Sequence, residues 1–190
     1  AEDRLDRAGF RPQVRTVDAT GPLDGEWDRI VATVSVRPIP PSWLAALRPG
    51  GRLVTTIAGT GLILTADRTP DGGAEGRTEW DRAGFMVTRT GSNYSPDAVD
   101  RIEAARTADA EHLDIGRYPI VNVMEAWELW SMLGVTAPGI EHDYREDKGA
   151  RTAIMTHADG SWARATGDAG GPVTVYQGGP RRLWDLLDDI

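Results

Sequence analysis

The sequence contains no cysteine, and this absence removes several kinds of chemistry at once. Disulfide frameworks, thiolate nucleophiles and cysteine-bound metal sites are all excluded. The absence of cysteine does not identify the cellular compartment, and a cytoplasmic location is the default expectation. Lysine is almost absent too, because Lys148 is the only one among 21 basic residues. We interpret this arginine bias as a property of the coding genome and not as a phosphate-binding device.

The chain also lacks long apolar runs and a basic stripe. The apolar runs are short, such as Ile30–Val34 and Leu62–Leu64, whereas a membrane span needs about 18 apolar residues. The opening AEDRLDRAGF is too charged for a signal peptide. The net charge of −8 does not suit a nucleic-acid binder, which usually carries a basic stripe. We therefore expect neither a membrane nor a nucleic acid as a partner.

What the sequence has is enough apolar surface for a folded core. Of its 190 residues 40% are apolar and 26% charged, and seven tryptophans supply large buriable surface. This length suffices for one domain plus an appendage. Leu5 and Ala8 have the spacing of a helix that ends at Gly9. Because this helix would begin without a cap, we expect the natural protein to begin earlier.

The first third of the chain has the pattern of an α/β protein. The continuous apolar run at Ile30, Val31 and Ala32 is typical of a strand that is buried on both faces. A strand, a helix and a strand with short links predict a βαβ unit with parallel pairing. We expect strands at residues 14–17, 27–34 and 53–58, a helix at 42–47 opened by Pro40 and Pro41, and a turn at 48–51.

From Gly61 onward the pattern changes to hairpins and further helices. Residues 62–66 and 74–78 flank a turn-rich loop and predict an antiparallel hairpin at the edge of the sheet. A short strand is expected at 85–87. Beyond it we expect a helix at 97–108 capped by Ser95 and Pro96, helices at 123–133 and 181–187, a polar loop at 138–149, a hairpin of 151–156 with 162–165, and a strand at 173–176.

The segment from Trp27 to Pro40 is the most informative for function. It predicts a strand that ends in small and polar residues, followed by a proline-bearing loop and a helix. Ligands of open α/β sheets bind at such carboxyl ends of strands, where small residues let a substrate backbone come close. The alternative is an ordinary connection between a strand and a helix, and the residues alone leave both open.

Three stretches of the chain carry a family resemblance. D-R-I-V-A-T, V-R-P-I-P-P-S-W-L and L-R-P-G-G-R-L-V resemble, in order and spacing, the middle motifs of protein-L-isoaspartate O-methyltransferases. This implies that residues 1–91 are the carboxyl-terminal part of a class I, Rossmann-like methyltransferase core in an α/β fold with an antiparallel edge. Residues 92–190 would then be an α+β extension of helices and hairpins that binds a peptide substrate or caps the sheet.

Two later stretches narrow the resemblance. H-A-D-G-S-W-A-R and Y-Q-G-G-P-R-R-L-W-D resemble the tail of family members that lie beside systems for ribosomal peptide maturation, such as ATP-grasp, lanthipeptide or lasso-peptide enzymes. This subset implies methylation of an aspartate in a modified peptide. The methyl ester would then collapse to an aspartimide or isoaspartate.

The resemblance also implies which residues form the site. It aligns Asp18 and Ala19 with the loop that holds the adenine of S-adenosylmethionine. Arg37 replaces a usual small residue or proline and could bind a peptide carboxylate through two hydrogen bonds, unless it is simply solvated. The implied cofactor-binding residues are Asp18, Ala19 and Thr33, and the implied substrate-binding residues are Val34, Ser35, Val36, Arg37, Ile39 and Pro40.

The chain departs from the family pattern in one respect. The glycine-rich cofactor loop and an early serine-containing segment are absent, so the resemblance implies a missing amino-terminal half as a partner. Gly59-Thr60-Gly61 does not replace that loop, because residues 62–65 read as a strand and a cofactor loop should open a helix.

The other candidate residues favour structural roles. His112, His142 and His157 have no metal-ligand spacing, and we expect no metal site. The stripe of Met124, Trp127 and Trp130 is interpreted as core, with a peptide groove as the alternative. Arg181 and Arg182 either face an acidic precursor peptide or lie in water.

The expected function is therefore an S-adenosylmethionine-dependent carboxyl O-methyltransferase that acts on aspartate or isoaspartate of a peptide, in the biosynthesis of a modified ribosomal peptide. A carboxylate is already nucleophilic at neutral pH, so positioning and electrostatics suffice for catalysis. A general isoaspartate-repair enzyme is the second hypothesis, against which the long extension argues. A non-catalytic peptide-binding module is the third.

Overall fold

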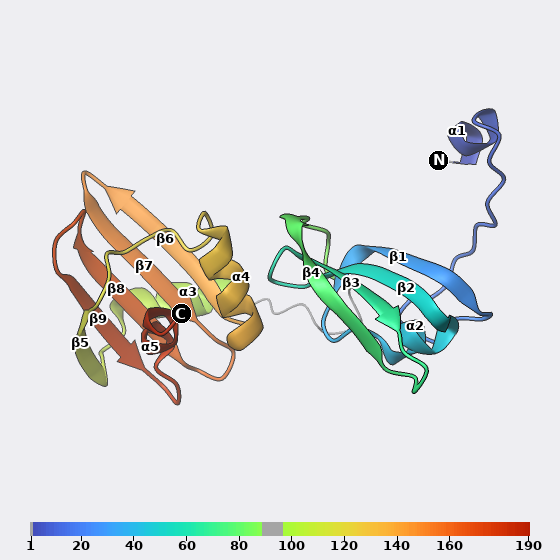
Figure 1. Cartoon of the computed structure of the whole chain (residues 1–190). Coiled ribbons are helices and arrows are strands. Elements are labelled where there is room, and N and C mark those ends of the chain that lie inside the picture. Colours follow the sequence, from blue (N-terminus) through green and yellow to red (C-terminus); the bar gives the residue numbers. More distant parts are fainter. Residues whose placement is uncertain (1, 89–96) are drawn as a thin grey trace.

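The computed structural model describes residues 2–88 and 97–190, which form two β-sheets of different kinds (Figure 1). The first is a four-stranded mixed sheet with the order β1-β2-β3-β4, and the second is a five-stranded antiparallel sheet with the order β5-β9-β8-β7-β6. The fold is therefore α/β with one mixed and one antiparallel sheet. Within the described residues, no helix has both the length and the apolar character needed to cross a bilayer.

The elements of the described chain follow one another in a simple order. They are α1 (Glu2–Arg7), β1 (Trp27–Val36), α2 (Pro41–Ala46), β2 (Leu47–Ile57), β3 (Leu62–Arg68), β4 (Ala74–Arg82), α3 (Ala98–Thr107), β5 (His112–Gly116), α4 (Trp127–Thr136), β6 (Glu141–Asp147), β7 (Ala150–Thr156), β8 (Trp162–Asp168), β9 (Val173–Gly178) and α5 (Leu183–Asp188).

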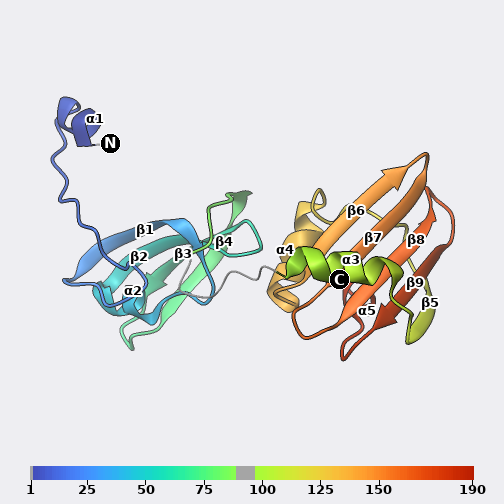
Figure 2. The same cartoon turned by 180° about the vertical axis from the view of Figure 1, so that it is seen from behind.

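The first sheet confirms the expected βαβ unit and the antiparallel hairpin. β1 and β2 pair in parallel, with Ile30 opposite Leu53, and α2 connects them. β3 and β4 add an antiparallel hairpin to the other side of β2. Figure 2 shows α2 beside the strands of this sheet. The core between them contains Trp43, Val36, Leu47 and Leu53. Proline at the start of α2 supplies the fixed backbone angle of a first helical turn.

Two expectations for the start of this sheet are wrong. Residues 14–17 form no strand but an exposed extended segment, because no strand of the described chain lies beside them. β1 is not buried on both faces. The even-numbered side chains from Ile30 to Val36 pack toward α2, whereas Val31 on the opposite face is 69% exposed. The apolar run predicted burial correctly for only one face because only one face is covered by a helix.

The expected turn at 48–51 lies inside β2. Trp27 pairs with Leu47 and Arg29 with Arg52, so two steps along β1 correspond to five along β2. The additional residues form a bulge in which Gly50 has a φ of 75°, a conformation that favours glycine. The backbone thus bends at the predicted turn, but β2 continues through it, from Leu47 to Ile57.

The short strand expected at 85–87 is present as a single bridge. Val87 pairs in parallel with Ser35, and the Ser35 backbone bonds to Met86 and Thr88. Residues 86–88 therefore pair with the end of β1 at Ser35. Within the described chain, no strand pairs with the earlier part of that edge.

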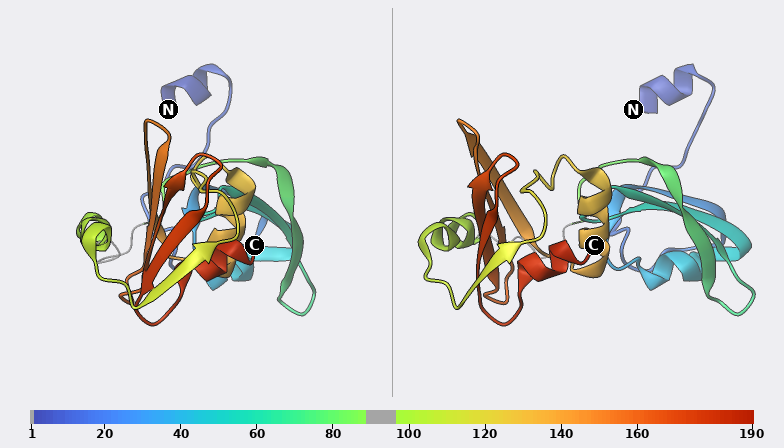
Figure 3. Two further views of the ribbon diagram at one scale, coloured as in Figure 1. Left: turned by 90° about the vertical axis from the view of Figure 1, so that its left-hand side faces the viewer. Right: turned by 60° about the vertical axis from the view of Figure 1, so that its left-hand side comes forward.

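The second sheet has helices on both faces (Figure 3). One face packs against α4 and α5, where Met155, Ala165 and Val175 meet Leu133 and Leu183. The other face is covered in part by α3, which contacts β6, β7 and β8. In Figure 3, α4 lies between the second sheet and the first. The expected hairpin of β7 with β8, the strand β9 and the helix α5 are confirmed.

Three expectations for this half need correction. Residues 138–149 are not a loop, because β6 occupies most of them and pairs with β7. The charged sequence of β6 resembles that of a loop, although edge strands commonly carry such charges. β5 at the other edge was not expected at all. The helix expected at 123–133 begins later and ends at Thr136. The caps expected at Ser95 and Pro96 lie outside the described residues.

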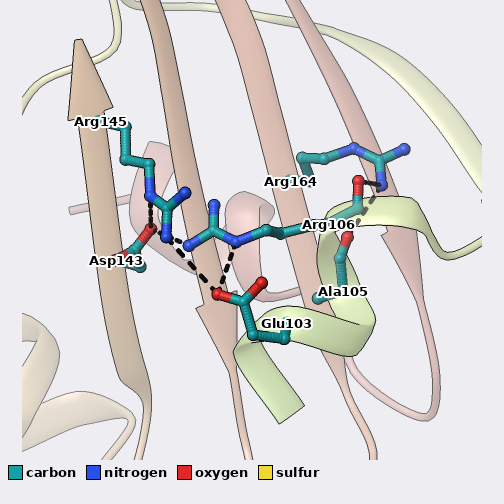
Figure 4. Close-up of polar contacts among 6 residues, drawn as sticks. All are labelled: Glu103, Ala105, Arg106, Asp143, Arg145 and Arg164. Carbon is teal, nitrogen blue, oxygen red and sulfur yellow. Dashed lines mark hydrogen bonds and ion pairs between the residues drawn. The ribbon is translucent and has the colours of Figure 1, made fainter. Parts of the chain in front are cut away.

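α3 is held to the sheet by arginines (Figure 4). Arg106 on α3 lies 2.6 Å from the Asp143 carboxylate and 2.9 Å from Glu103. Arg145 on β6 lies 3.5 Å from the same two carboxylates, so two cations share two anions. Arg164 on β8 donates to the carbonyls of Ala105, Arg106 and Ala108, where α3 ends. Charge and hydrogen bonds, more than apolar packing, fix this helix.

Candidate functional site

A cleft of about 590 Å³ lies at the carboxyl ends of the parallel strands β1 and β2. This is the end of an α/β sheet at which ligands usually bind. One wall comes from the first sheet and the other from α4 and the segment that leads into β6. The lining residues are Arg37, Ala58, Gly59, Val87, Met124, Trp130, Leu133, Gly134, Ala137, Pro138, Gly139, Ile140, Glu141 and His142.

Among the predicted substrate residues, Arg37 is the one that lines this cleft. It is exposed, and its guanidinium has no hydrogen-bond or ion-pair partner within residues 2–88 and 97–190. An unpaired guanidinium can bind a carboxylate through two parallel hydrogen bonds. Beside it, Trp130 and the half-exposed Met124 offer apolar surface. The cleft therefore suits an anionic group attached to an apolar segment.

The other predicted residues of this segment do not belong to the lining of the cleft. Thr33 is exposed on the open face of β1, and Val34 and Val36 are turned toward α2. Ile39 packs into the same core, and Pro40 is buried at the start of α2. Their contacts position the strand end and the helix that carry Arg37.

Ser35 is buried in a hydrogen-bonded network that joins two strands and the segment after β4. Its hydroxyl lies 2.7 Å from the Thr56 hydroxyl on β2 and donates to the Phe85 carbonyl at 3.0 Å. Thr56 also donates to the Val34 carbonyl at 3.4 Å. This network links β1, β2 and residues 85–88 directly below the cleft.

We expect Ser35→Ala to lower the free energy of unfolding by about 2 kcal/mol, because Thr56 and the Phe85 carbonyl lose a buried partner. Adding Thr56→Val should recover part of this loss, since it removes the hydroxyl that has lost its nearer partner while the side-chain shape is kept. Urea unfolding of the two single variants and the double variant measures the coupling. Additive losses in the double variant would show that the two hydroxyls do not interact.

Asp18 and Ala19, predicted at the adenine, lie in a loop that is fixed to α2. The Asp18 Oδ1 accepts from the hydroxyl and the backbone of Thr20, and the hydroxyl bond is the main reason that its pKa lies below the ordinary value. The Ala19 carbonyl accepts from the Trp43 indole, and the Thr20 carbonyl from Ser42. The loop therefore has a fixed place at the amino-terminal end of α2.

The turn at residues 58–61 supports the other wall of the cleft. Gly59-Thr60-Gly61 is followed by the strand β3, as expected, and not by a helix. The fully buried Thr60 accepts at its carbonyl from Ser131 of α4 at 2.6 Å. Trp127 and Trp130 lie over Gly61, and Arg82 stacks on the Trp127 ring. Sequence reasoning missed this contact, although an isolated glycine within a helical pattern, Gly134, can signal close packing.

His142 lines the cleft from the first residues of β6. Burial lowers the pKa of its imidazole to about 4, so it is neutral at physiological pH. A neutral imidazole can donate from one ring nitrogen and accept at the other. Glu141 beside it also lines the cleft. The sequence had suggested a solvated loop here, and the strand pairing of β6 explains the burial instead.

The burial of His142 predicts a loss of stability in mild acid. Its pKa in the folded state lies below its ordinary value of 6.5, so the unfolded state binds the proton better. The contribution of neutral His142 to the free energy of unfolding is fully present above pH 6.5. It should fall by about 2 kcal/mol as the pH drops toward 4, and this value already allows for the partial exposure of the side chain. Urea unfolding against pH should show a smaller loss in His142→Gln. His112→Gln, at an exposed site, should keep the wild-type profile. Identical profiles for all three proteins would contradict the assignment.

The remaining observations concern metal ligands and similarity to known proteins. Across residues 2–88 and 97–190, histidine, aspartate and glutamate side chains form no group of three that could hold a metal ion. Arg37, Trp130 and His142 line the cleft and are placed to contact a bound group. Comparisons of the chain with protein-family models, with curated proteins and with solved structures found no match.

Proposed function

We propose that the chain is the carboxyl-terminal part of an S-adenosylmethionine-dependent carboxyl O-methyltransferase of Rossmann-like fold. The observation that carries this proposal is the cleft at the carboxyl ends of β1 and β2 with the unpaired Arg37 in its wall. The acceptor would be an aspartate or isoaspartate of a peptide, in the maturation of a ribosomal peptide in the cytoplasm. The parallel pair with an antiparallel hairpin beside it is consistent with half of such a sheet.

The edge of β1 that faces away from β2 suits a second half of the enzyme. A hollow of about 330 Å³ lies there, lined by Val17, Leu23, Trp27, Ile30 and Val31 among others, and it is mainly apolar. Apolar surface of this kind is expected where another protein layer packs. We propose that the cofactor-binding half covers it.

The residues present fit only one edge of the cofactor. The Asp18 carboxylate uses Oδ1 within its own turn, which leaves Oδ2 for the adenine amine. Ala19 and the exposed Thr33 would lie beside it. When bound, S-adenosylmethionine supplies a methyl group on a positively charged sulfur.

The acceptor carboxylate would attack that methyl in line, and the bond from sulfur to methyl would break as the bond from oxygen to methyl forms. No proton moves, so no general base is needed. Arg37 would hold the peptide through a neighbouring carboxylate, and the apolar walls at Trp130 and Met124 would exclude water. The neutral His142 could bond to the peptide backbone.

The extension favours a dedicated peptide substrate over general repair. Most of the cleft lining comes from residues 124–142, so the acceptor site depends on the extension. A binding module without catalysis is the second candidate, because the same cleft could hold a peptide without cofactor.

A methyl-transfer assay tests the proposal. The protein with its natural amino-terminal region is incubated with labelled S-adenosylmethionine and aspartate-containing peptides. Arg37→Gln should raise the KM for the peptide about tenfold and leave the affinity for S-adenosylmethionine unchanged. Arg77→Gln, at an exposed position of β4, is the control. Peptide binding that depends on Arg37 without any methyl transfer would favour the binding module, and equal activity on any isoaspartyl peptide would favour repair.

A further inference from the structure

β5 is an edge strand with apolar side chains and a free backbone edge. It pairs with β9 on one side, and within the described chain no strand pairs on its other side. Leu113 is 66% exposed and Ile115 is 79% exposed, and both lie on one face of the sheet. α3 contacts β6, β7 and β8 and leaves this part of the face open. Such an edge can pair with an additional extended chain.

The surroundings of β5 are acidic. Residues 97–190 hold 17 acidic and nine basic side chains, whereas residues 1–96 hold twelve of each, so the whole net charge of −8 lies in the second part. Beside β5, a hollow of about 180 Å³ is lined by Asp114, Asp185 and Asp188. Its two arginines are already paired, Arg117 with Asp189 and Arg182 with Asp114 and Asp185.

Arg181 and Arg182 were expected either to face an acidic peptide or to lie in water, but both are paired with carboxylates. Arg182 is engaged by carboxylates, and Arg181 bonds to Asp159. Neither guanidinium is therefore free to attract an acidic peptide. The carboxylates at this edge outnumber the guanidinium groups of Arg117 and Arg182, and the excess of negative charge favours a basic peptide. These carboxylates belong to Asp114, Asp185, Asp188 and Asp189.

We propose that β5 binds an extended, basic segment of the peptide substrate by strand addition. This inference rests on the proposed function and adds a second contact for the same peptide. Side chains of an added strand alternate between the two faces. One set would pack on Leu113 and Ile115, and the other would place cationic groups near Asp114 and the hollow beside it.

The sheet itself sets the distance between this edge and the cleft. The strand register aligns His112 of β5 with Gln177, and it places the start of β6, at Glu141, at the same end of the sheet. Four strand spacings separate the two edges, which corresponds to about 19 Å. An extended peptide needs at least about six residues to span this distance. The basic segment and the methylated residue must therefore be at least that far apart in the sequence.

A second copy of the chain is a poorer occupant of this edge. Symmetric antiparallel pairing about Asp114 would match Leu113 with Ile115, but it would also set two Asp114 carboxylates directly opposite each other. Two copies with a net charge of −8 each would also repel.

The test uses fluorescent synthetic peptides and the full chain, without cofactor. A peptide of alternating lysine and valine should bind, whereas the alternating glutamate and valine peptide should not. Methylation of the backbone nitrogens along one edge should abolish binding, because strand addition needs those donors. The double substitution Leu113→Lys and Ile115→Lys should weaken binding at least about tenfold. Val99→Lys, at an equally exposed position on α3, should have no effect.

Several outcomes would overturn the inference. These are equal binding of the acidic and basic peptides, no effect of the β5 substitutions, or self-association of the chain that Leu113→Lys abolishes. Because the measurement needs no methyl transfer, failure of the β5 site is distinguishable from failure of the catalytic proposal. Retained Arg37-dependent methylation with no β5 effect would reject only the second contact.

Discussion

Gly134→Ala should destabilise the protein by about 3 kcal/mol, although alanine is the better helix former. Gly134 lies in α4, where this change alone would stabilise a helix by up to about 1 kcal/mol. A methyl group there would overlap the Gly59 carbonyl and approach Thr60 to 3.0 Å. Backbone cannot rotate away as a side chain can, so α4 must move off the turn at 58–61.

The sign of the change makes this experiment decisive. Thermal and urea unfolding of Gly134→Ala are compared with Gly84→Ala, where a methyl group meets no atom within 4 Å. The control should change stability little. A stabilised Gly134→Ala variant would mean that α4 does not rest on the turn, and the cleft between them would then be wrong as well.

Arg164→Ala should cost about 3 kcal/mol and release α3 from the sheet. The guanidinium donates to the Ala105 and Arg106 carbonyls at 2.8 and 2.6 Å, and its charge lies at the carboxyl end of the helix (Figure 4). It also stacks on the Tyr176 ring at 4.6 Å. One guanidinium thus serves three carbonyl acceptors at the end of α3, those of Ala105, Arg106 and Ala108.

Hydrogen exchange locates this effect, and two variants calibrate it. Amides of α3 should lose protection in Arg164→Ala while those of β1 and β2 keep theirs. Arg164→Lys should recover only part of the stability, because an ammonium group cannot stack flat on the Tyr176 ring while it donates to several carbonyls at once. Arg145→Gln, at a more exposed ion pair of the same face, should cost less than about 1 kcal/mol. Equal losses for Arg164→Ala and Arg145→Gln would refute the special role of Arg164.

The sequence predicted those parts of the fold whose signals are local. The βαβ unit, the hairpin of β3 with β4 and the hairpin of β7 with β8 all follow from apolar runs that are bounded by proline or glycine turns. β5 and β6 were missed for different reasons: β5 has only five residues, whereas β6 is an edge strand that is rich in charged side chains. Their pairing depends on neighbours far along the chain.

The candidate site was predictable only in part for the same reason. Arg37 follows a recognisable strand end, so its pattern pointed to a ligand. Its partners in the cleft wall, Gly59, Gly134 and His142, come from three other regions. Only the folded chain brings them together, and no spacing in the sequence reports that they meet.

The contact between α4 and the turn at 58–61 has a thermodynamic consequence. α4 belongs to the core of the second sheet, yet its Ser131 bonds to a carbonyl of the first. A ligand in the cleft touches both sheets, so its binding free energy is released only while both are folded. Occupancy should thus make the halves melt cooperatively, and two transitions in the free protein would merge into one as the ligand concentration rises.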